Sequence, residues 1–350
     1  MVNRRLISTL EKNNLLDRRQ HAFRKGKGAV SHFCSLDEHI EQTINNGHHC
    51  DIALLDLAKA YDRTWRWNVI KTLNHWGIEG HFFNFICNFL NDRQFRVGIG
   101  GKMSSLKTLE NGIPQGSVLS VTLFLVAMES IFKDIPASVE VLLYADDILL
   151  ISKGPFQITV RSRLQMAVHA VSQWAQSIGS SISANKSQLI HCCQMKRHRK
   201  QVKPLSANNT EIKEVRSTKI LGVYIDSKLS FKTHFSHLRK EANNRMRIIK
   251  TIGQRSKIGC RKTIFSIGKS ILLSKLTYGI ELYSRADWST IDRINPAYNG
   301  IIRYASGAFC TSPIDALIAE AGELPFPVFT ETSNKMQRKT HKHRTYSYQG

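Results

Sequence analysis

Hydrophobic positions along the chain follow two spacings, one typical of helices and one typical of strands. Apolar residues three and four apart predict amphipathic helices, and unbroken apolar runs of about 4–8 residues predict buried strands. Strand patterns lie at residues 50–57, 142–151, 189–190 and 219–226, and residues 93–109 alternate as a β-ribbon turning at Gly100-Gly101. Helical patterns lie at residues 4–16, 35–45, 58–73, 80–90, 118–132 and 156–178, and through most of the chain beyond 230.

Two adjacent carboxylates, Asp146 and Asp147, interrupt the apolar run at 142–151. The apolar flanks predict a buried hairpin whose tip carries both charges. Like charges this close repel unless a cation lies between them, and hard oxygen ligands suit Mg²⁺ or Mn²⁺. A solvated Asp-Asp turn is the alternative, and it is the better interpretation of the stretch taken alone.

A third carboxylate, Asp56, comes near the end of the buried strand predicted at 50–57. If the two strand segments pair side by side, Asp56, Asp146 and Asp147 converge on one edge of a sheet. Such a group of carboxylates can hold two metals in the arrangement used for in-line nucleotidyl transfer. One ion activates the attacking 3′-hydroxyl, and the other binds the triphosphate and stabilises the leaving pyrophosphate.

The overall charge changes the list of possible partners. In 350 residues, 50 Lys and Arg oppose 27 Asp and Glu, a formal net charge of +23. From residue 191 onward 29 basic residues oppose 11 acidic ones, so the excess is concentrated in the C-terminal half. This balance predicts a polyanionic partner, with the C-terminal half as the main surface for a nucleic-acid backbone. No apolar run approaches the roughly 20 residues of a membrane span, so a membrane partner is not expected.

The seven cysteines are scattered, and no secretory leader precedes them. This usage favours reduced thiols and a nuclear or cytoplasmic location over secretion. His191, Cys192, Cys193 and His198 lie close together in sequence. They lack the paired spacing of a structural zinc site, so no zinc is expected there.

Three segments together resemble a known family. Residues 55–62 (Leu-Asp-Leu-Ala-Lys-Ala-Tyr-Asp), 112–119 (Gly-Ile-Pro-Gln-Gly-Ser-Val-Leu) and 144–147 (Tyr-Ala-Asp-Asp) stand in the order and spacing of motifs A, B and C of reverse transcriptases. The chain is similar to those of non-LTR (LINE-like) retrotransposons of the jockey type. Residues 221–226 resemble the primer-grip motif, Trp174 with Asn185-Lys186 resembles motif D, and segments between 307 and 325 resemble the end of the thumb. Several ordered motifs make the turn-only interpretation of Asp146-Asp147 a poor one.

The resemblance implies the roles of the metal ligands and of a sugar gate. Asp56 and Asp146 are the principal metal ligands, Asp147 is a third carboxylate of the site, and the carbonyl of Leu57 is a further oxygen ligand. Tyr61 takes the place of the aromatic steric gate, which leaves no room for a 2′-hydroxyl and so selects dNTPs. Packing in the core at the turn from strand to helix is the alternative role of this ring.

Further roles are implied for the substrate-binding residues. Gln115 and Gly116 are expected beside the nascent base pair, where glycine permits close backbone approach. Lys186 corresponds to the motif D lysine that protonates the leaving pyrophosphate as a general acid, with a surface lysine as the alternative. The family's fingers motif, which contacts template or triphosphate, is matched by Arg24, Lys25 and Lys27.

The architecture that the resemblance implies is of the α+β class: a right-hand polymerase fold with an RRM-like antiparallel palm sheet, partial fingers and a helical thumb. Its predicted boundaries are N-terminally truncated fingers at 1–47, a palm at 48–235 with a fingers segment around 80–110, a basic helical thumb at 236–330, and a basic, disordered tail at 331–350. The implied activity is RNA-directed DNA synthesis with Mg²⁺ or Mn²⁺, and the implied partners are an RNA template, a DNA primer or target, and dNTPs.

Val121 stands where motif B usually has proline, a change at the helix entry that we expect to be tolerated. A second departure keeps an alternative open, because the resemblance begins downstream of the first fingers motifs. A catalytically inactive, nucleic-acid-binding remnant of such an element is therefore the second hypothesis. A maturase-like protein is a third, because maturases share the Tyr-Ala-Asp-Asp signature, but the thumb segments speak against it.

Overall fold

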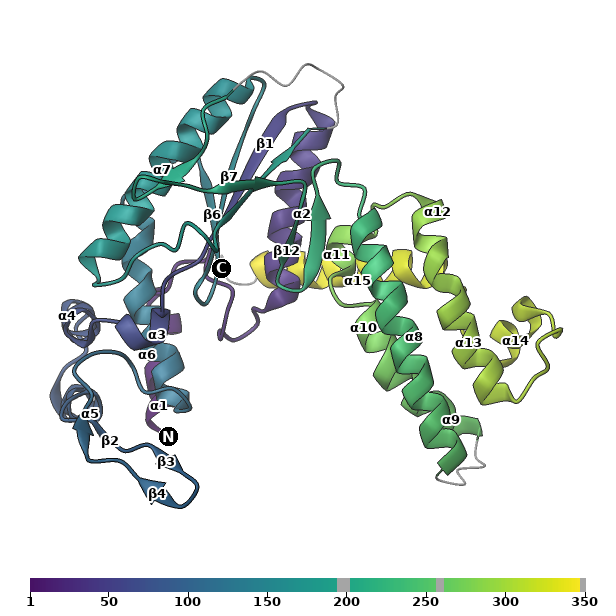
Figure 1. Ribbon diagram of the computed structural model, residues 1–350, viewed down its shortest axis with the longest axis horizontal. Helices are drawn as coiled ribbons and strands as arrows, with labels where there is room; N and C mark the ends of the chain where they lie inside the picture. Colours follow the sequence, from purple (N-terminus) through teal and green to yellow (C-terminus); the bar gives the residue numbers. More distant parts are fainter. Residues whose placement is uncertain (194–201, 256–260, 347–350) are drawn as a thin grey trace. The chain divides into compact units, whose positions relative to one another are not determined.

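A computed structural model describes residues 1–193, 202–255 and 261–346 (Figure 1). The chain divides into two compact units. The first comprises Met1–Gly28, Thr43–His191 and Met195–Val215, and the second comprises Ala29–Gln42, Cys192–Gln194 and Arg216–Gly350.

The first unit is built on a five-stranded sheet with the order β11-β8-β1-β7-β6. Its strands are β1 (His49–Leu55), β6 (Glu140–Tyr144), β7 (Asp147–Gly154), β8 (Gln188–Cys192) and β11 (Lys213–Val215). β7 runs antiparallel to both β1 and β6, whereas β11 runs parallel to β8. The unbroken apolar runs of β1 and β7 fit their central places in the sheet, where most of their side chains are buried.

Helices and short β-ribbons complete the first unit. α7 packs against β1 and β7, and α6, whose residues are almost all buried, packs against α1 and α4. The helices are α1 (Val2–Lys12), α3 (Ala60–Arg63), α4 (Arg66–His75), α5 (Gly80–Leu90), α6 (Val118–Met128), η1 (Glu129–Phe132) and α7 (Gln157–Ser177). The short strands are β2 (Gln94–Phe95), β3 (Gly98–Ile99), β4 (Lys102–Met103), β5 (Lys107–Thr108), β9 (Ser206–Ala207) and β10 (Thr210–Glu211).

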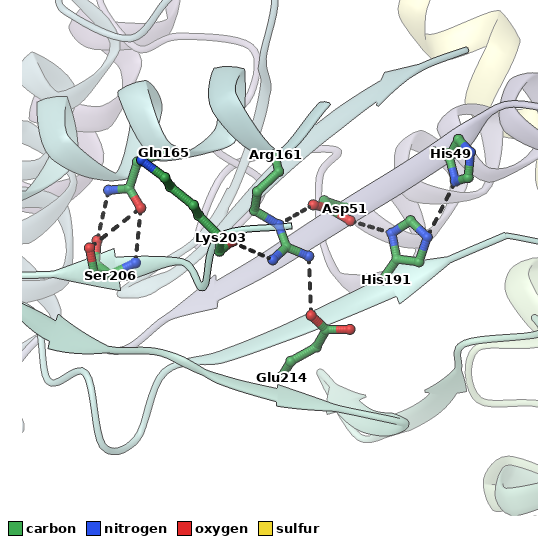
Figure 2. Close-up of polar contacts among 8 residues, drawn as sticks. All are labelled: His49, Asp51, Arg161, Gln165, His191, Lys203, Ser206 and Glu214. Carbon is green, nitrogen blue, oxygen red and sulfur yellow. Dashed lines mark hydrogen bonds and ion pairs between the residues drawn. The ribbon is translucent and has the colours of Figure 1, made fainter. Parts of the chain in front are cut away.

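A buried ionic network joins α7 to the sheet of the first unit (Figure 2). Asp51 on β1 is fully buried, and its carboxylate accepts a hydrogen bond from Arg161 Nε at 2.5 Å and contacts His191 Nδ1 at 2.5 Å. Arg161 on α7 also donates to Glu214 on β11 at 3.1 Å, and His49 stacks on His191. The charges compensate one another in a place that excludes water, so the network sets how α7 lies on β1, β8 and β11.

The second unit is mostly helical. Its elements are α2 (Ala29–Asn45, of which residues 29–42 belong here), β12 (Ser217–Ile220), β13 (Val223–Asp226), α8 (Lys232–Arg255), α9 (Arg261–Gly268), η2 (Lys269–Leu273), α10 (Ser274–Leu276), α11 (Ile280–Tyr283), α12 (Trp288–Ile291), η3 (Asp292–Ile294), α13 (Asn295–Ser306), α14 (Ile314–Glu320) and α15 (Phe326–Tyr346). Buried rings of Phe235 and Tyr283 meet edge to face at 5.4 Å in its core. Arg285 binds Asp37 and Glu41 of α2, each at 2.6 Å.

Two expectations about secondary structure were wrong. Residues 219–226 form part of an antiparallel hairpin of β12 and β13, not one strand, because Leu221 and Gly222 both adopt positive φ and turn the chain. The tail expected to be disordered is helical as far as Tyr346, as the end of α15. That helix begins at Phe326, which is buried against Tyr298, and a fixed start lowers the cost of extending a helix.

Other expectations can be compared only over the described residues. There, no disulfide joins Cys34, Cys50, Cys87, Cys192, Cys193 or Cys310, and none of the described helices has the length and hydropathy of a membrane span. His198 of the cluster near Cys192 lies outside the described residues, as does most of the basic run at 195–203.

Candidate active site

The pairing of β1 with β7 brings the three predicted carboxylates to one edge of the sheet. The antiparallel register pairs Leu55 with Ile148 at the end of β1. Asp56 directly follows Leu55, Asp147 directly precedes Ile148, and the negative charge of Asp56 acts on the Asp147 carboxyl. Residues ninety positions apart in sequence are thereby neighbours in space.

The hairpin between β6 and β7 presents Asp146 at its tip. Tyr144 pairs with Asp147, which leaves Ala145 and Asp146 as a two-residue turn. Ala145 is buried and has a φ of 57°, a left-handed conformation that costs a non-glycine residue about 1–2 kcal/mol. Asp146 and Asp147 are both exposed. The turn is thus strained at the residue that precedes the two carboxylates.

The three carboxylates interact electrostatically. Asp147 keeps contact with solvent, yet the protein atoms around its carboxyl partly desolvate it and, together with the negative charges of Asp146 and Asp56, raise its pKa. Within the described part of the chain, no three His, Cys, Asp or Glu side chains are gathered closely enough to hold a metal by themselves. The raised pKa of Asp147 therefore reflects both desolvation and repulsion by the two neighbouring carboxylates.

The chain after Asp56 pairs with the segment that carries Lys186. Ser183 N donates to Asp56 O at 2.9 Å, and Asp56 N donates to the hydroxyl of Ser187 at 3.1 Å. Lys186 is exposed and directly precedes this serine. The predicted general acid is therefore on a segment hydrogen-bonded to the backbone of a predicted metal ligand.

The predicted sugar gate has a fixed ring. Tyr61 on α3 stacks on Phe124 of α6, with ring centroids 4.2 Å apart and planes at 15°. Burial and the charge of Asp146 raise the pKa of the Tyr61 hydroxyl, which places this ring near the tip of the hairpin. The ring therefore has both a packing role and a position beside the carboxylates.

The loop at 111–117 packs closely on α3. Ile113 N donates to Tyr61 O at 2.9 Å, and a Cβ on Gly112 would come within 2.6 Å of the carbonyl oxygen of Asp62. The side-chain amide of Gln115 donates to Asp62 Oδ1 at 3.3 Å. Gly116 has a φ of 91° and open space where a Cβ would lie. Gly112 thus permits the close approach of this loop to α3, where Ile113 contacts Tyr61 and Gln115 contacts Asp62.

The three basic residues of the predicted fingers motif are not gathered at the carboxylates by any contact that we observe. The Arg24 side chain is 7% exposed, and its guanidinium binds Glu11 at 2.6 Å. Lys27 Nζ donates to Arg18 O, and burial lowers the pKa of this ammonium to about 8. Lys25 is exposed. Arg24 therefore has a structural role at the end of α1, and Lys25 is the freest to contact a ligand.

The predicted primer grip lies in the second unit. Tyr278 OH donates to Leu221 O at 2.8 Å, and a Cβ on Gly222 would lie 3.3 Å from the Tyr278 ring. The tip of this hairpin is therefore held against a tyrosine by a short contact.

Two supporting residues, Phe124 and Ser187, could not be identified from sequence. The pattern around Phe124 indicates only a core position of a helix, and the pattern around Ser187 indicates only a turn. Their contacts with Tyr61 and Asp56 depend on pairing between distant segments, which no local pattern encodes.

Comparisons with known proteins agree with this geometry. A family model described as "Reverse transcriptase (RNA-dependent DNA polymerase)" matches residues 1–225. An RNA-directed DNA polymerase from mobile element jockey of Drosophila melanogaster is 27% identical over 318 residues, which cover 88% of this chain and 34% of that protein. A probable RNA-directed DNA polymerase from transposon X-element of the same species is 26% identical, over 87% of this chain and 33% of that protein. The chain thus spans about a third of the length of these relatives.

A likeness to a solved structure concerns the fold alone. A telomerase from Candida albicans, solved in complex with a TWJ fragment of telomeric RNA, superposes with a TM-score of 0.54 at 14% sequence identity. The match covers 93% of this chain and 58% of that one. The mixed α+β architecture is therefore that of a right-hand polymerase fold.

Proposed function

The chain belongs to the reverse transcriptase family, and from this premise we propose that it is an RNA-directed DNA polymerase of a non-LTR retrotransposon of the jockey type. It would extend a DNA 3′ end on an RNA template with dNTPs. The observation that supports this proposal is the register of β1 and β7, which pairs Leu55 with Ile148, the residues next to Asp56 and Asp147, beside a strained turn.

The carboxylates suit Mg²⁺ or Mn²⁺ as ligands. Mg²⁺ is typically bound by one or two carboxylates together with substrate phosphates, so the nucleotide would supply the remaining ligands. Asp56, Asp146 and Asp147 would supply the carboxylates, and the carbonyl of Leu57 a further oxygen. Bound divalent ions would increase the nucleophilicity of the 3′-hydroxyl and neutralise charge that develops on the triphosphate.

Other side chains would position the substrate and move a proton. The Tyr61 ring, backed by Phe124, would lie under the incoming sugar. Gln115 and Gly116 would lie beside the nascent base pair. The Lys186 ammonium would give a proton to the leaving pyrophosphate. The basic loop of Arg24, Lys25 and Lys27 would contact the template or triphosphate, chiefly through Lys25.

The domain assignment is also a proposal. We assign residues 1–47 and about 80–110 to the fingers, 48–235 to the palm and 236–330 to the thumb. The basic α8 in that thumb would bind the phosphate backbone of the template-primer duplex. A nuclear or cytoplasmic location remains a prediction.

Primer extension tests the proposed activity. The purified chain should extend a 5′-labelled DNA primer annealed to an RNA template when dNTPs and Mg²⁺ or Mn²⁺ are present. Extension should stop when EDTA is added. Salt-sensitive binding to the same duplex, without any product in either metal, would instead support the nucleic-acid-binding remnant.

The gate assignment makes a separate prediction about Tyr61. Tyr61→Ala should raise incorporation of rNTPs relative to dNTPs by about 10–100-fold, because the overpacking that excludes a 2′-hydroxyl is worth about 1–3 kcal/mol. Tyr61→Phe keeps the ring on Phe124 and should keep the discrimination. The measurement is kcat/KM for matched rNTP and dNTP pairs. Equal discrimination by all three proteins would assign Tyr61 to core packing alone.

A further inference from the structure

A short segment before the basic loop pairs with the outer edge of β6. Residues 19–21 add to the sheet beside this strand: Leu143 N donates to Arg19 O at 2.9 Å, and His21 N donates to Leu143 O at 2.9 Å. The bridge between Gln20 and Leu143 is parallel. This segment therefore has a fixed position beside Leu143, two residues before Ala145 in the turn of the active-site hairpin.

The Gln20 side chain reaches from that segment to the strained residue of the hairpin. It is 2% exposed. Its Oε1 accepts hydrogen bonds from Ala145 N at 3.1 Å and from Ala22 N at 3.0 Å, and its Nε2 lies 3.4 Å from Ala145 O. One amide thus contacts both polar backbone atoms of Ala145, the residue at φ 57°.

We propose that Gln20 is a positioning residue of the active site, which holds Ala145 in its left-handed conformation so that Asp146 and Asp147 face Asp56. This inference rests on the proposed function, since it assigns Gln20 a purpose only if the carboxylates bind divalent ions. Gln20 contacts none of the three carboxylates in a hydrogen bond that we observe, so it would act through the backbone.

The physical reason lies in the balance of strain and burial at Ala145. The left-handed conformation is unfavourable for alanine, and a two-residue turn has other conformations available to it. Buried backbone groups cost free energy when they lose their partners. The Gln20 amide satisfies both backbone groups of Ala145 in the observed conformation, so it favours that conformation. A metal site requires its ligands within about 0.5 Å of their working positions.

The chain offers a matched control for this arrangement. Gln165 on α7 binds the backbone of a single residue in the same way: Ser206 N donates to its Oε1 at 2.9 Å, and its Nε2 donates to Ser206 O at 2.9 Å (Figure 2). Ser206 is in the short strand β9, in a different part of the first unit from the hairpin. Gln165→Met and Gln20→Met remove the same kind of contact with a similar change of side-chain volume.

The experiment measures Mn²⁺ binding by electron paramagnetic resonance, in which free Mn²⁺ gives the signal, for the full chain with template-primer bound. Gln20→Met should weaken the Mn²⁺ affinity about tenfold. This factor corresponds to the free-energy cost of one left-handed residue, which metal binding would then have to supply. Gln165→Met should leave the affinity unchanged. Far-UV circular dichroism and Tm, measured on both variants, compare their folding.

A second variant separates positioning from general stability. Ala145→Gly removes the cost of positive φ at this residue. Gln20→Met should therefore weaken Mn²⁺ binding by a smaller factor in the Ala145→Gly background than in the wild-type background. The same factor in both backgrounds, or equal effects of Gln20→Met and Gln165→Met, would overturn the positioning role. Asp146→Asn tests the proposed function separately. If this variant binds Mn²⁺ as tightly as the wild type does, the proposed metal site itself is rejected, whatever the effect of Gln20→Met.

Discussion

Asp146→Asn should abolish primer extension, with a loss of at least about a thousandfold in the rate of nucleotide addition. Metal-assisted stabilisation of a transferring phosphoryl group is worth several kcal/mol, and each 1.4 kcal/mol is about tenfold in rate. Asparagine keeps the size of the side chain but removes the negative charge that a divalent ion requires. The measurement is single-turnover extension at saturating dNTP, with template-primer binding measured in parallel.

The same substitution should not destabilise the fold. The pKa of Asp147 is raised by burial and by the charges of Asp146 and Asp56, so the folded state binds its proton more tightly than the unfolded chain does. Protonated Asp147 therefore contributes to the free energy of unfolding at low pH. This contribution is lost as the pH rises above the usual carboxyl range and through the raised pKa of the folded state. Removing the charge of Asp146 relieves this repulsion, so Tm without metal at pH 7 should stay equal or rise. A lower Tm would attribute lost activity to misfolding.

The control for charge is Asp134→Asn. Asp134 is an exposed carboxylate of the same unit, after η1 and outside the candidate site. This variant should retain wild-type extension. Equal product from wild type and Asp146→Asn would reject Asp146 as a catalytic ligand.

Asp51→Asn should lower the free energy of unfolding by about 3–5 kcal/mol, because it leaves buried Arg161 without its nearest counter-charge. For a unit of this size the change corresponds to a Tm lower by roughly 10 °C. The network lies beside the start of β1, whereas the candidate site follows its end. Active-site residues are therefore not directly altered. Urea unfolding followed by circular dichroism is the measurement.

An exposed ion pair provides the comparison for the buried one. Glu331 and Lys335 are 2.6 Å apart, with side chains that are 63% and 69% exposed. Glu331→Gln should leave the urea midpoint essentially unchanged, because solvent screens such a pair. If Asp51→Asn costs no more than Glu331→Gln, the buried network does not fix α7 on the sheet.

The sequence was most informative where carboxylates interrupt or end an apolar run that predicts a strand. The apolar runs around Asp146-Asp147 predicted the hairpin, and the run ending near Asp56 predicted the strand beside it. Both strands form, and they pair as expected. The family resemblance supplied the expected roles of Tyr61 and Gln115. In the structure Tyr61 lies on α3, and the close approach of Gly112 lets Gln115 bind Asp62 of the same helix.

Features that depend on contacts between distant segments could not be predicted. Gln20 is separated by 125 residues from Ala145, and nothing in its own surroundings distinguishes it from a surface glutamine. Arg24 matched a substrate-binding motif, yet its guanidinium is paired with Glu11. Periodicity also missed the turn at Leu221-Gly222, because a tight turn of apolar residues continues an apolar run without interruption.

Iron-directed cleavage tests most directly whether Asp56 and the hairpin tip share one bound cation. Fe²⁺ in place of Mg²⁺, with ascorbate and peroxide, generates hydroxyl radicals that cut the backbone beside the bound ion. The predicted result is two groups of cuts, one near residues 56–57 and one near 145–147, that disappear together in excess Mg²⁺ and in Asp146→Asn. Cuts at only one of these segments, or cuts that persist in Asp146→Asn, would contradict a shared metal site.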